Sequence, residues 1–301
     1  MTLLGVFAAC VFLLGLLFGS FLNVCISRLP ACESIVKPRS RCPSCSHPIR
    51  WYDNLPILSW LLLRARCRDC NLPISWRYPA VELATGLWFA AAAQRLSQAS
   101  HSAAIIDAIA FAILGFLLIG LMVMDWQTQR LPDAFTLTGI ASGLLLACAQ
   151  AALLAPGEGD IVLNTTHQLR LSSPGSMAAQ GNVFLTGPEA LVFGRIAAIA
   201  AAALILLAVR WTYKALRRRD GMGLGDVKLL AMIAAFLGLS QSLLALFAGV
   251  LAAGLFALAL LALRRATSNT RIPFGSFLAA GGLFATLFGA QIVSWYAGLL
   301  R

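Results

Sequence analysis

The chain has 301 residues, of which 59% are apolar and only 12% are charged, and its mean hydropathy is +0.82. Soluble domains are about 45–50% apolar and about a quarter charged. This composition excludes a water-soluble globule for most of the chain and indicates a polytopic membrane protein. The formal net charge of +11 would favour nucleic-acid binding in a soluble chain, but basic inner loops account for it here. We therefore expect no nucleic-acid partner and a lipid bilayer as the surroundings.

The apolar segments predict an all-α fold with about eight transmembrane helices, each needing about 20 residues. The first span covers residues 1–27, which carry no charge. The other seven cover about 79–96, 103–124, 134–154, 191–211, 226–239, 241–263 and 273–298. The uncharged run from Leu229 to Leu263 is too long for one crossing, so a break is expected at Gly238–Ser242 and the sixth span is short.

The loop charges predict the orientation of these spans. Residues 28–78 and the later loops on the same side hold most of the Lys and Arg, whereas the other side has only Arg95, Arg170 and Arg301. Lys and Arg accumulate in cytoplasmic loops, so both chain termini are expected outside. The polar stretch 155–190 is then an extracytoplasmic loop.

Residues 28–78 are expected to form a small polar domain between the first two spans. The domain contains two CxxC pairs, Cys42 with Cys45 and Cys67 with Cys70, at the spacing of a four-thiolate zinc ribbon. Two disulfides are the alternative, but thiols stay reduced in the cytoplasm, so structural zinc is favoured. A site closed by four protein ligands has no open position for chemistry.

Two carboxylates are expected at the same cytoplasmic depth although about 100 residues separate them. Asp125 ends the third span and Asp226 opens the sixth. Acids at such positions are costly and are candidates for function. Two carboxyl groups that face each other share a proton, so that one activates water while the other polarises a carbonyl group. The Gly223-x-Gly225 segment allows close approach of an extended substrate.

Structural roles compete for some of these acids. Asp133 follows Leu131-Pro132 and is expected to cap the fourth span, and Asp226 alone would also serve as a helix cap. Glu82 lies one turn into the second span and is expected to serve the neighbouring polar domain.

Several motifs, in a fixed order, give the chain a resemblance to a known family. They are Gly19–Val24 with Arg28–Pro30, the two CxxC pairs, Asn54–Ser59, Ile74–Pro79 with Glu82, Asp125 to Asp133, Gly223–Asp226 with Lys228, and Pro273–Gly275. Together they resemble the bacterial prepilin peptidases, also called type IV leader peptidases, of the bifunctional kind.

The resemblance implies a GxGD aspartic peptidase with Asp125 and Asp226 as the catalytic pair and Gly223, Gly225 and Lys228 in the active-site loop. Such enzymes cleave the basic leader of type IV prepilins or type II secretion pseudopilins, after Gly and usually before Phe. They then methylate the new N-terminus with S-adenosylmethionine. The family's setting implies the bacterial inner membrane, with both termini periplasmic.

By the same resemblance, the chain divides into the first span at 1–27, a zinc-binding, methyltransferase-associated domain at 28–78 and a peptidase domain at 79–301. The sequence assigns no site for S-adenosylmethionine. Ser276 replaces a second Pro that the family usually has, and we expect it not to touch the acid pair. The alternatives are a GxGD intramembrane protease with other substrates, or an ion-coupled transporter that uses the same two Asp.

Overall fold

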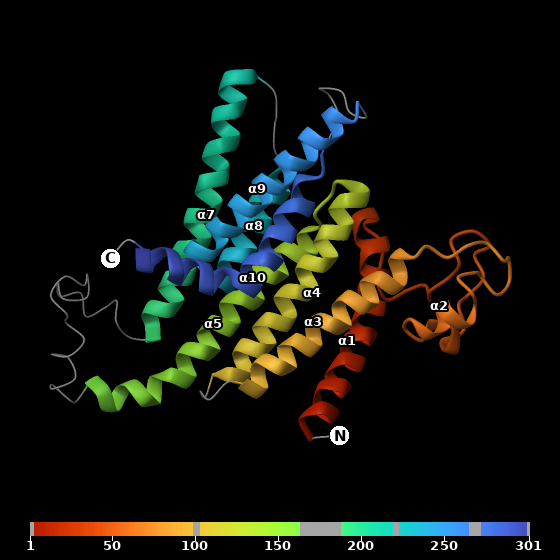
Figure 1. The fold of residues 1–301 in the computed structure, drawn as a ribbon, viewed down its shortest axis with the longest axis horizontal. Helices are drawn as coiled ribbons and strands as arrows, with labels where there is room; N and C mark the ends of the chain where they lie inside the picture. The colour runs from red at the N-terminus through yellow and green to blue at the C-terminus, as the bar shows by residue number, and fades with distance from the viewer. Residues whose placement is uncertain (1–2, 99–102, 163–187, 219–222, 265–271, 300–301) are drawn as a thin grey trace.

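The computed structural model describes residues 3–98, 103–162, 188–218, 223–264 and 272–299 (Figure 1). Within these ranges the chain is helical, with nine α-helices and two short 3₁₀ helices. In chain order they are α1 (Leu3–Arg28), η1 (Leu29–Ala31), η2 (Trp51–Asn54), α2 (Leu58–Leu62), α3 (Arg77–Gln98), α4 (Ala104–Thr128), α5 (Asp133–Val162), α7 (Pro188–Arg217), α8 (Leu224–Leu237), α9 (Leu239–Ala262) and α10 (Phe274–Leu299).

Each of the eight predicted spans corresponds to one helix, but eight full crossings are not established. In the described part of the chain, six helices are long and apolar enough to cross a membrane, namely α1, α4, α5, α7, α9 and α10. Helix α3 carries Arg77, Glu82 and Arg95, which lower its hydropathy. Helix α8 has 14 residues and measures about 21 Å, less than the roughly 30 Å of a hydrocarbon core.

The break predicted near Gly238 is confirmed. Gly238 lies between α8 and α9 with φ +80°, and its backbone N–H donates a hydrogen bond to Ala234 O. A left-handed backbone of this kind favours glycine, because a side chain would be strained there. The uncharged run therefore forms a short helix followed by a full-length one.

The polar loop expected at 155–190 is shorter than predicted. Helix α5 continues to Val162 and α7 begins at Pro188, so both ends of this stretch are helical. Once a helix has formed, polar residues can extend it at little cost, since each added residue makes one backbone hydrogen bond. Residues 163–187 lie outside the described residues, as do Arg170 and Arg301.

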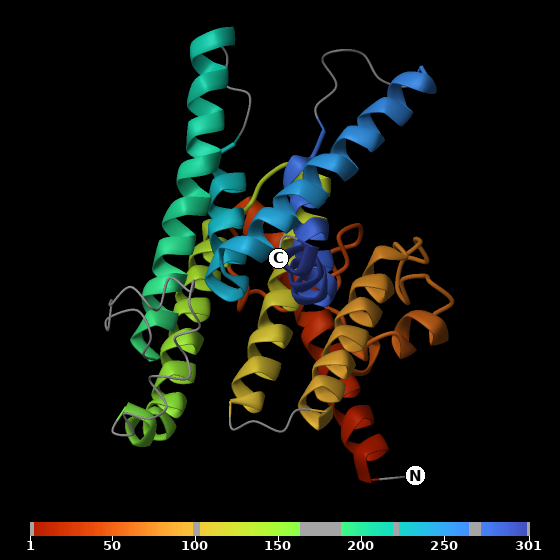
Figure 2. The same cartoon turned by 60° about the vertical axis from the view of Figure 1, so that its left-hand side comes forward.

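Helix α8 forms the centre of the bundle and contacts α4, α5, α7, α9 and α10 (Figures 1 and 2). Its residues Leu229, Leu230, Met232 and Ile233 have no exposed surface. This explains why a short helix is apolar all round: every side of it meets another helix. Helices α1 and α3 pack together on one flank, and residues 29–76 between them form a polar unit, here called the cysteine module.

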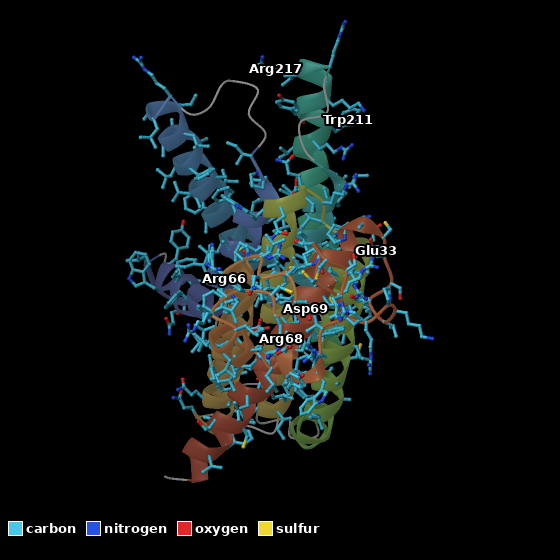
Figure 3. All side chains as sticks on the ribbon, turned by 90° about the vertical axis from the view of Figure 1, so that its right-hand side faces the viewer. Glu33, Arg66, Arg68, Asp69, Trp211 and Arg217 are labelled. Carbon is cyan, nitrogen blue, oxygen red and sulfur yellow. The ribbon has the colours of Figure 1, made fainter. Side chains whose placement is uncertain are left out.

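The helices place the two candidate acids near one another. In Figure 1 the N-terminus lies at the lower end, whereas the carboxyl ends of α4, α7 and α9 lie toward the upper end. Figure 3 shows Arg217 at that end of α7, and Arg66 and Arg68 on the cysteine module. The carboxyl end of α4 and the amino end of α8, which carry Asp125 and Asp226, are thus in the same part of the bundle.

Helices α9 and α10 approach closely because glycine lies at their contact. A Cβ atom on Gly281 in α10 would lie 2.3 Å from Ala245 O in α9. A Cβ atom on Gly249 in α9 would lie 2.9 Å from the Cα atom of Leu278. Backbone packs on backbone here, so neither position has space for a methyl group.

We expect Gly281→Ala to destabilise the bundle by about 1–3 kcal/mol, because the added methyl group overlaps the backbone of α9. The midpoint of thermal unfolding in detergent micelles measures the effect. Gly254→Ala in α9 is the matched control, since a Cβ atom there meets nothing within 4 Å. Equal midpoints for the two variants would contradict this account of the contact.

Candidate functional site

Asp125 lies in the last turn of α4 and is buried, with 5% of its surface exposed. Its Oδ2 atom accepts a hydrogen bond of 2.7 Å from the backbone N–H of Ser276, at the start of α10. The Ser276 hydroxyl lies 3.1 Å from the same oxygen and 2.9 Å from Met122 O. The amino end of α10 therefore holds this carboxyl group in place.

The expectation that Ser276 lies away from the acid pair is wrong. Ser276 donates its backbone N–H to Asp125 and shares its single hydroxyl proton between Asp125 and Met122 O, whereas a Pro at this position would have neither group. The contact joins residues 151 positions apart, so no local pattern in the sequence reveals it.

Asp226 occupies the third position of α8 and is also buried. Gly223 is the N-cap of α8, and its backbone N–H hydrogen-bonds the Asp226 carboxyl group. Asp226 is therefore not the N-cap that the alternative expected, but its carboxyl group makes the reach-back contact of a capping box from inside the helix. The charges of Asp226 and Asp125 also act on each other, so the structure brings the predicted pair together.

Two glycines allow α8 and α10 to close around Leu131. A Cβ atom on Gly225 would lie 3.0 Å from Leu131 Cβ, and one on Gly275 would lie 3.0 Å from both Leu131 Cδ1 and Asp125 Cγ. Larger residues at either position would push the two helices away from α4. Gly225 and Gly275 thus fix the distance between the elements that carry the acids.

Lys228, on the first turns of α8, donates a hydrogen bond of 2.6 Å to Asp133 Oδ1 on α5. The backbone N–H of Thr136 bonds to Pro132 O, so Pro132 rather than Asp133 holds the N-cap position of α5. The predicted cap is therefore off by one residue. Asp133 instead links α5 to α8, two residues beyond Asp226.

The cysteine module brings its four cysteines into one cluster. The Sγ atoms of Cys42, Cys45, Cys67 and Cys70 all lie within 4.8 Å of one another, and Cys42 and Cys70 are 3.8 Å apart. All four are free thiols, which speaks against the disulfide alternative. Tetrahedral zinc with bonds of about 2.3 Å requires sulfur–sulfur separations of about 3.8 Å. The arrangement thus fits a structural zinc ion.

The two CxxC pairs lie in a repeated structure that the spacing of the cysteines alone did not reveal. Arg41–Trp51 and Arg66–Trp76 share the pattern R-C-x-x-C-x-x-P-I-x-W. Each copy closes with an isolated β-bridge, from Arg41 to Pro48 and from Arg66 to Pro73. This internal repeat was the available signal for two equivalent metal-binding turns.

Backbone N–H groups bond the cysteines of these turns, and for Cys42 they favour the thiolate form. The N–H groups of Cys45 and Ser44 point at Cys42 and lower the pKa of its thiol to about 6. His47 and Leu72 occupy equivalent positions in the two copies, and their N–H groups bond Cys45 and Cys70. Such N–H···S contacts orient the ligands for a shared metal ion.

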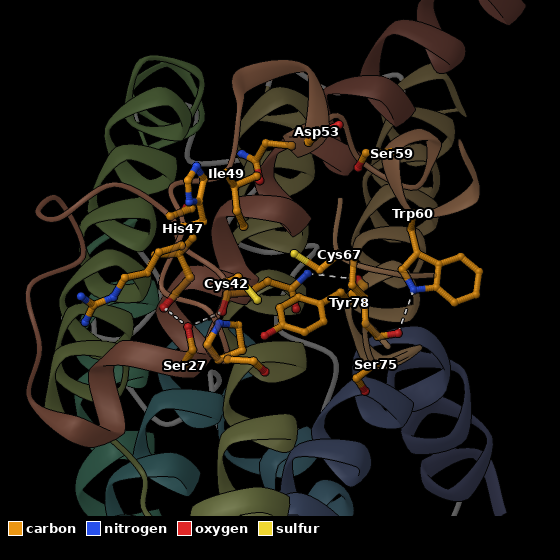
Figure 4. Close-up of a pocket in the computed structure, with 18 of the residues that line it drawn as sticks. Ser27, Cys42, His47, Ile49, Asp53, Ser59, Trp60, Cys67, Ser75 and Tyr78 are labelled. Carbon is orange, nitrogen blue, oxygen red and sulfur yellow. Dashed lines mark hydrogen bonds between the residues drawn. The ribbon is translucent and has the colours of Figure 1, made fainter. Parts of the chain in front are cut away.

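A cavity of about 700 Å³ lies between the cysteine module and helices α1 and α3 (Figure 4). Residues of the module, among them Asp53, Trp60 and Cys67, line one part of it. Asn23 and Glu82 line it from the helices. Arg68 bonds both oxygens of Asp53 and holds the pKa of that carboxyl group below its usual range.

Two family models match the chain: the bacterial peptidase A24 N-terminal domain over residues 13–96 and the type IV leader peptidase family over residues 170–258. A prepilin leader peptidase/N-methyltransferase of Aeromonas hydrophila is 33% identical over 310 residues, covering 95% of this chain and 92% of the relative. The chain belongs to this family. No solved structure shows a significant match.

Further relatives of this peptidase family carry the same name. The protein of Pseudomonas aeruginosa is 32% identical over 96% of this chain and 93% of its own length. That of Myxococcus xanthus is 43% identical over 47% of this chain and 40% of its own length. Membership in this family makes the chain a peptidase. Together with the apolar helices, it indicates a multi-pass protein of the inner membrane.

The methyltransferase part of the family name implies S-adenosylmethionine as the methyl donor. The cavity beside the cysteine module fits such a ligand, because its volume is within the range of about 300–1,000 Å³ for small-molecule sites. Its walls also include the buried acceptor Asn23 Oδ1, which has no hydrogen-bond partner among the described residues.

We expect Cys42→Ser to remove zinc from the purified protein and to lower its thermal stability, because three thiolates and a hydroxyl bind the ion less tightly. Metal analysis by mass spectrometry gives the zinc content per chain. Cys148→Ser is the control, since Cys148 is an exposed thiol on α5 outside the cluster. Unchanged zinc in Cys42→Ser would refute ligation by this residue.

Proposed function

We propose that the protein cleaves the basic leader peptide from type IV prepilins or type II secretion pseudopilins and methylates the new N-terminus. The observation that carries the proposal is the buried pair of Asp125 and Asp226 at facing ends of α4 and α8. A family of prepilin leader peptidases supplies the substrate class. Cleavage occurs after Gly and usually before Phe.

The pair performs peptide hydrolysis by sharing one proton. The ionised carboxylate takes a proton from water, which attacks the scissile carbonyl carbon, while the protonated carboxyl donates to the carbonyl oxygen. Ser276 keeps the Asp125 oxygen in one orientation, and Gly223 does the same for Asp226. Gly225 packs against Leu131, which sets the position of the following Asp226, and Lys228 holds α8 against Asp133 of α5.

Charge favours a cytoplasmic approach of the substrate. Arg130, Arg217 and Arg264 lie at or just after the carboxyl ends of α4, α7 and α9, so the proposal assigns this end of the bundle to the cytoplasmic side and both termini to the periplasm. A basic leader concentrates at the anionic inner leaflet, and its apolar continuation enters the bilayer. The scissile bond then lies near the membrane surface, at the depth of Asp125 and Asp226.

The proposed organisation has three parts. Residues 1–27 are the first span, 28–78 are a cytoplasmic domain stabilised by zinc on the four cysteines, and 79–301 are the peptidase domain. S-adenosylmethionine supplies the methyl group when bound. Mass spectrometry of a prepilin incubated with the protein and S-adenosylmethionine tests the function: loss of the leader plus one methyl group is expected, and an unprocessed prepilin would refute it.

We expect Asp125→Asn and Asp226→Asn each to lower leader cleavage by about 10³-fold or more, because each removes half of the acid–base pair. Gel assays of prepilin processing measure the rate. Asp107→Asn is the matched control: Asp107 is on α4 as well, but in its first turn. Normal cleavage by either of the first two variants would rule out the dyad.

We expect Ser276→Ala to lower leader cleavage by about 10-fold, since it removes the hydroxyl contact to Asp125 but keeps the backbone donor. Ser276→Pro removes both donors and is expected to cost more. The comparison of kcat between the two variants checks this order. Full activity of Ser276→Pro would show that the contact has no part in catalysis.

A further inference from the structure

Two residues that line the cavity beside the cysteine module have buried polar atoms without partners. Among the described residues, three buried side-chain atoms lack a hydrogen bond: Asn23 Oδ1, Arg77 Nε and Thr136 Oγ1. Two of them belong to residues that line this one cavity. Buried polar groups are normally paired, so an unpaired acceptor and an unpaired donor in one cavity indicate a polar ligand.

Glu82 adds a carboxylate to the same wall. It is 8% exposed, and Ser20 and Asn23 of α1 face it across the α1–α3 contact. Asn23 is itself 4% exposed and uses its Nδ2 atom to donate to Tyr78 O, which leaves Oδ1 for a ligand. A carboxylate beside a free amide oxygen is an acceptor pair suited to an ammonium group.

The position of this wall indicates which ammonium group it takes. Arg77 lines the cavity and donates from Nη1 to Gln127 Oε1, two residues beyond Asp125. The cavity therefore adjoins the end of α4 where the leader is cut. A new N-terminus released at Asp125 has its ammonium group next to its own first carbonyl oxygen. The ammonium group matches the acceptors Glu82 and Asn23, and the carbonyl oxygen matches the free Nε donor of Arg77.

We propose that this cavity is the methyl-transfer site and that Glu82 and Asn23 bind the new N-terminal ammonium of the cleaved substrate. The proposal rests on the proposed function, which supplies that substrate. The part of the cavity formed by the cysteine module then receives the methyl donor from the cytoplasm.

Glu82 also acts as the base. The substrate ammonium gives one proton to the Glu82 carboxylate and becomes a neutral amine with a free electron pair. Bound S-adenosylmethionine supplies the methyl group: the new N–C bond forms as the S–C bond breaks, and its electron pair stays on sulfur as a thioether. The product is a secondary ammonium, and Glu82 returns its proton to water.

A structural role for Glu82 is present as well and has to be separated from this one. Glu82 Oε2 accepts a hydrogen bond of 2.8 Å from the backbone N–H of Ile57, in the cysteine module. Gln at this position keeps an oxygen for Ile57 but has no charge and accepts no proton. Glu82→Gln thus preserves the contact to the module and removes the base.

The experiment compares three measurements on Glu82→Gln and wild type: leader cleavage, methylation of a synthetic peptide that begins with the mature N-terminus, and S-adenosylmethionine binding by calorimetry. We expect methylation to fall by about 10²-fold or more. Cleavage and donor binding should stay within about threefold of wild type. Asp107→Asn is the matched control, because Asp107 lies in the first turn of α4 and does not line the cavity, and it should leave all three measurements unchanged.

Each other outcome counts against the proposal. Methylation within threefold of wild type would show that Glu82 is not the base. Loss of donor binding would assign the acceptor pair to the cationic donor instead of the peptide. Loss of both leader cleavage and bound zinc in Glu82→Gln would show that Glu82 acts only through its structural contact to Ile57. Failure of the wild-type protein to cleave a prepilin would instead contradict the proposed function, and the cleavage assay shows this independently of the methylation assay.

Discussion

A carboxyl group buried in an apolar helix bundle requires hydrogen-bond donors. The donors of Asp125 come from Ser276, a residue 151 positions away. Because Ser276 must reach Asp125, the first turn of α10 lies against the last turn of α4. Gly275 makes this approach possible, and Leu131 fills the space between the two helices and Gly225. The position of Asp226 follows, since it is one residue beyond Gly225. One buried hydrogen bond thus sets the arrangement of three helices.

The same end of α4 also joins the peptidase helices to the cysteine module. Arg77 bonds Gln127 from the start of α3, and Arg130 donates to Pro30 O in the chain after α1. Glu82 bonds Ile57 from the other side. These contacts cross between segments of distant sequence, and they join the cysteine module and the start of α3 to the carboxyl end of α4.

The sequence predicts those features that depend on local pattern. Uncharged runs mark the helices, CxxC spacing marks the cysteines that cluster, and the topology places Asp125 and Asp226 at one depth. It does not predict the partners of these groups, because Ser276, Asn23 and Glu82 act through contacts between remote segments. It also does not fix the number of crossings, since an apolar run in α8 indicates burial among helices as readily as burial in lipid.

The length of α8 explains why the second acid lies inside the protein. At about 21 Å the helix spans only part of a hydrocarbon core, so at least one of its ends must lie within the bundle. Gly238 turns the chain directly into α9 at one end, and Gly223 caps the other. A longer helix would carry Asp226 beyond the end of α4. The break at Gly238 and the glycines before Asp226 are therefore as necessary to the pairing of the two acids as the acids themselves.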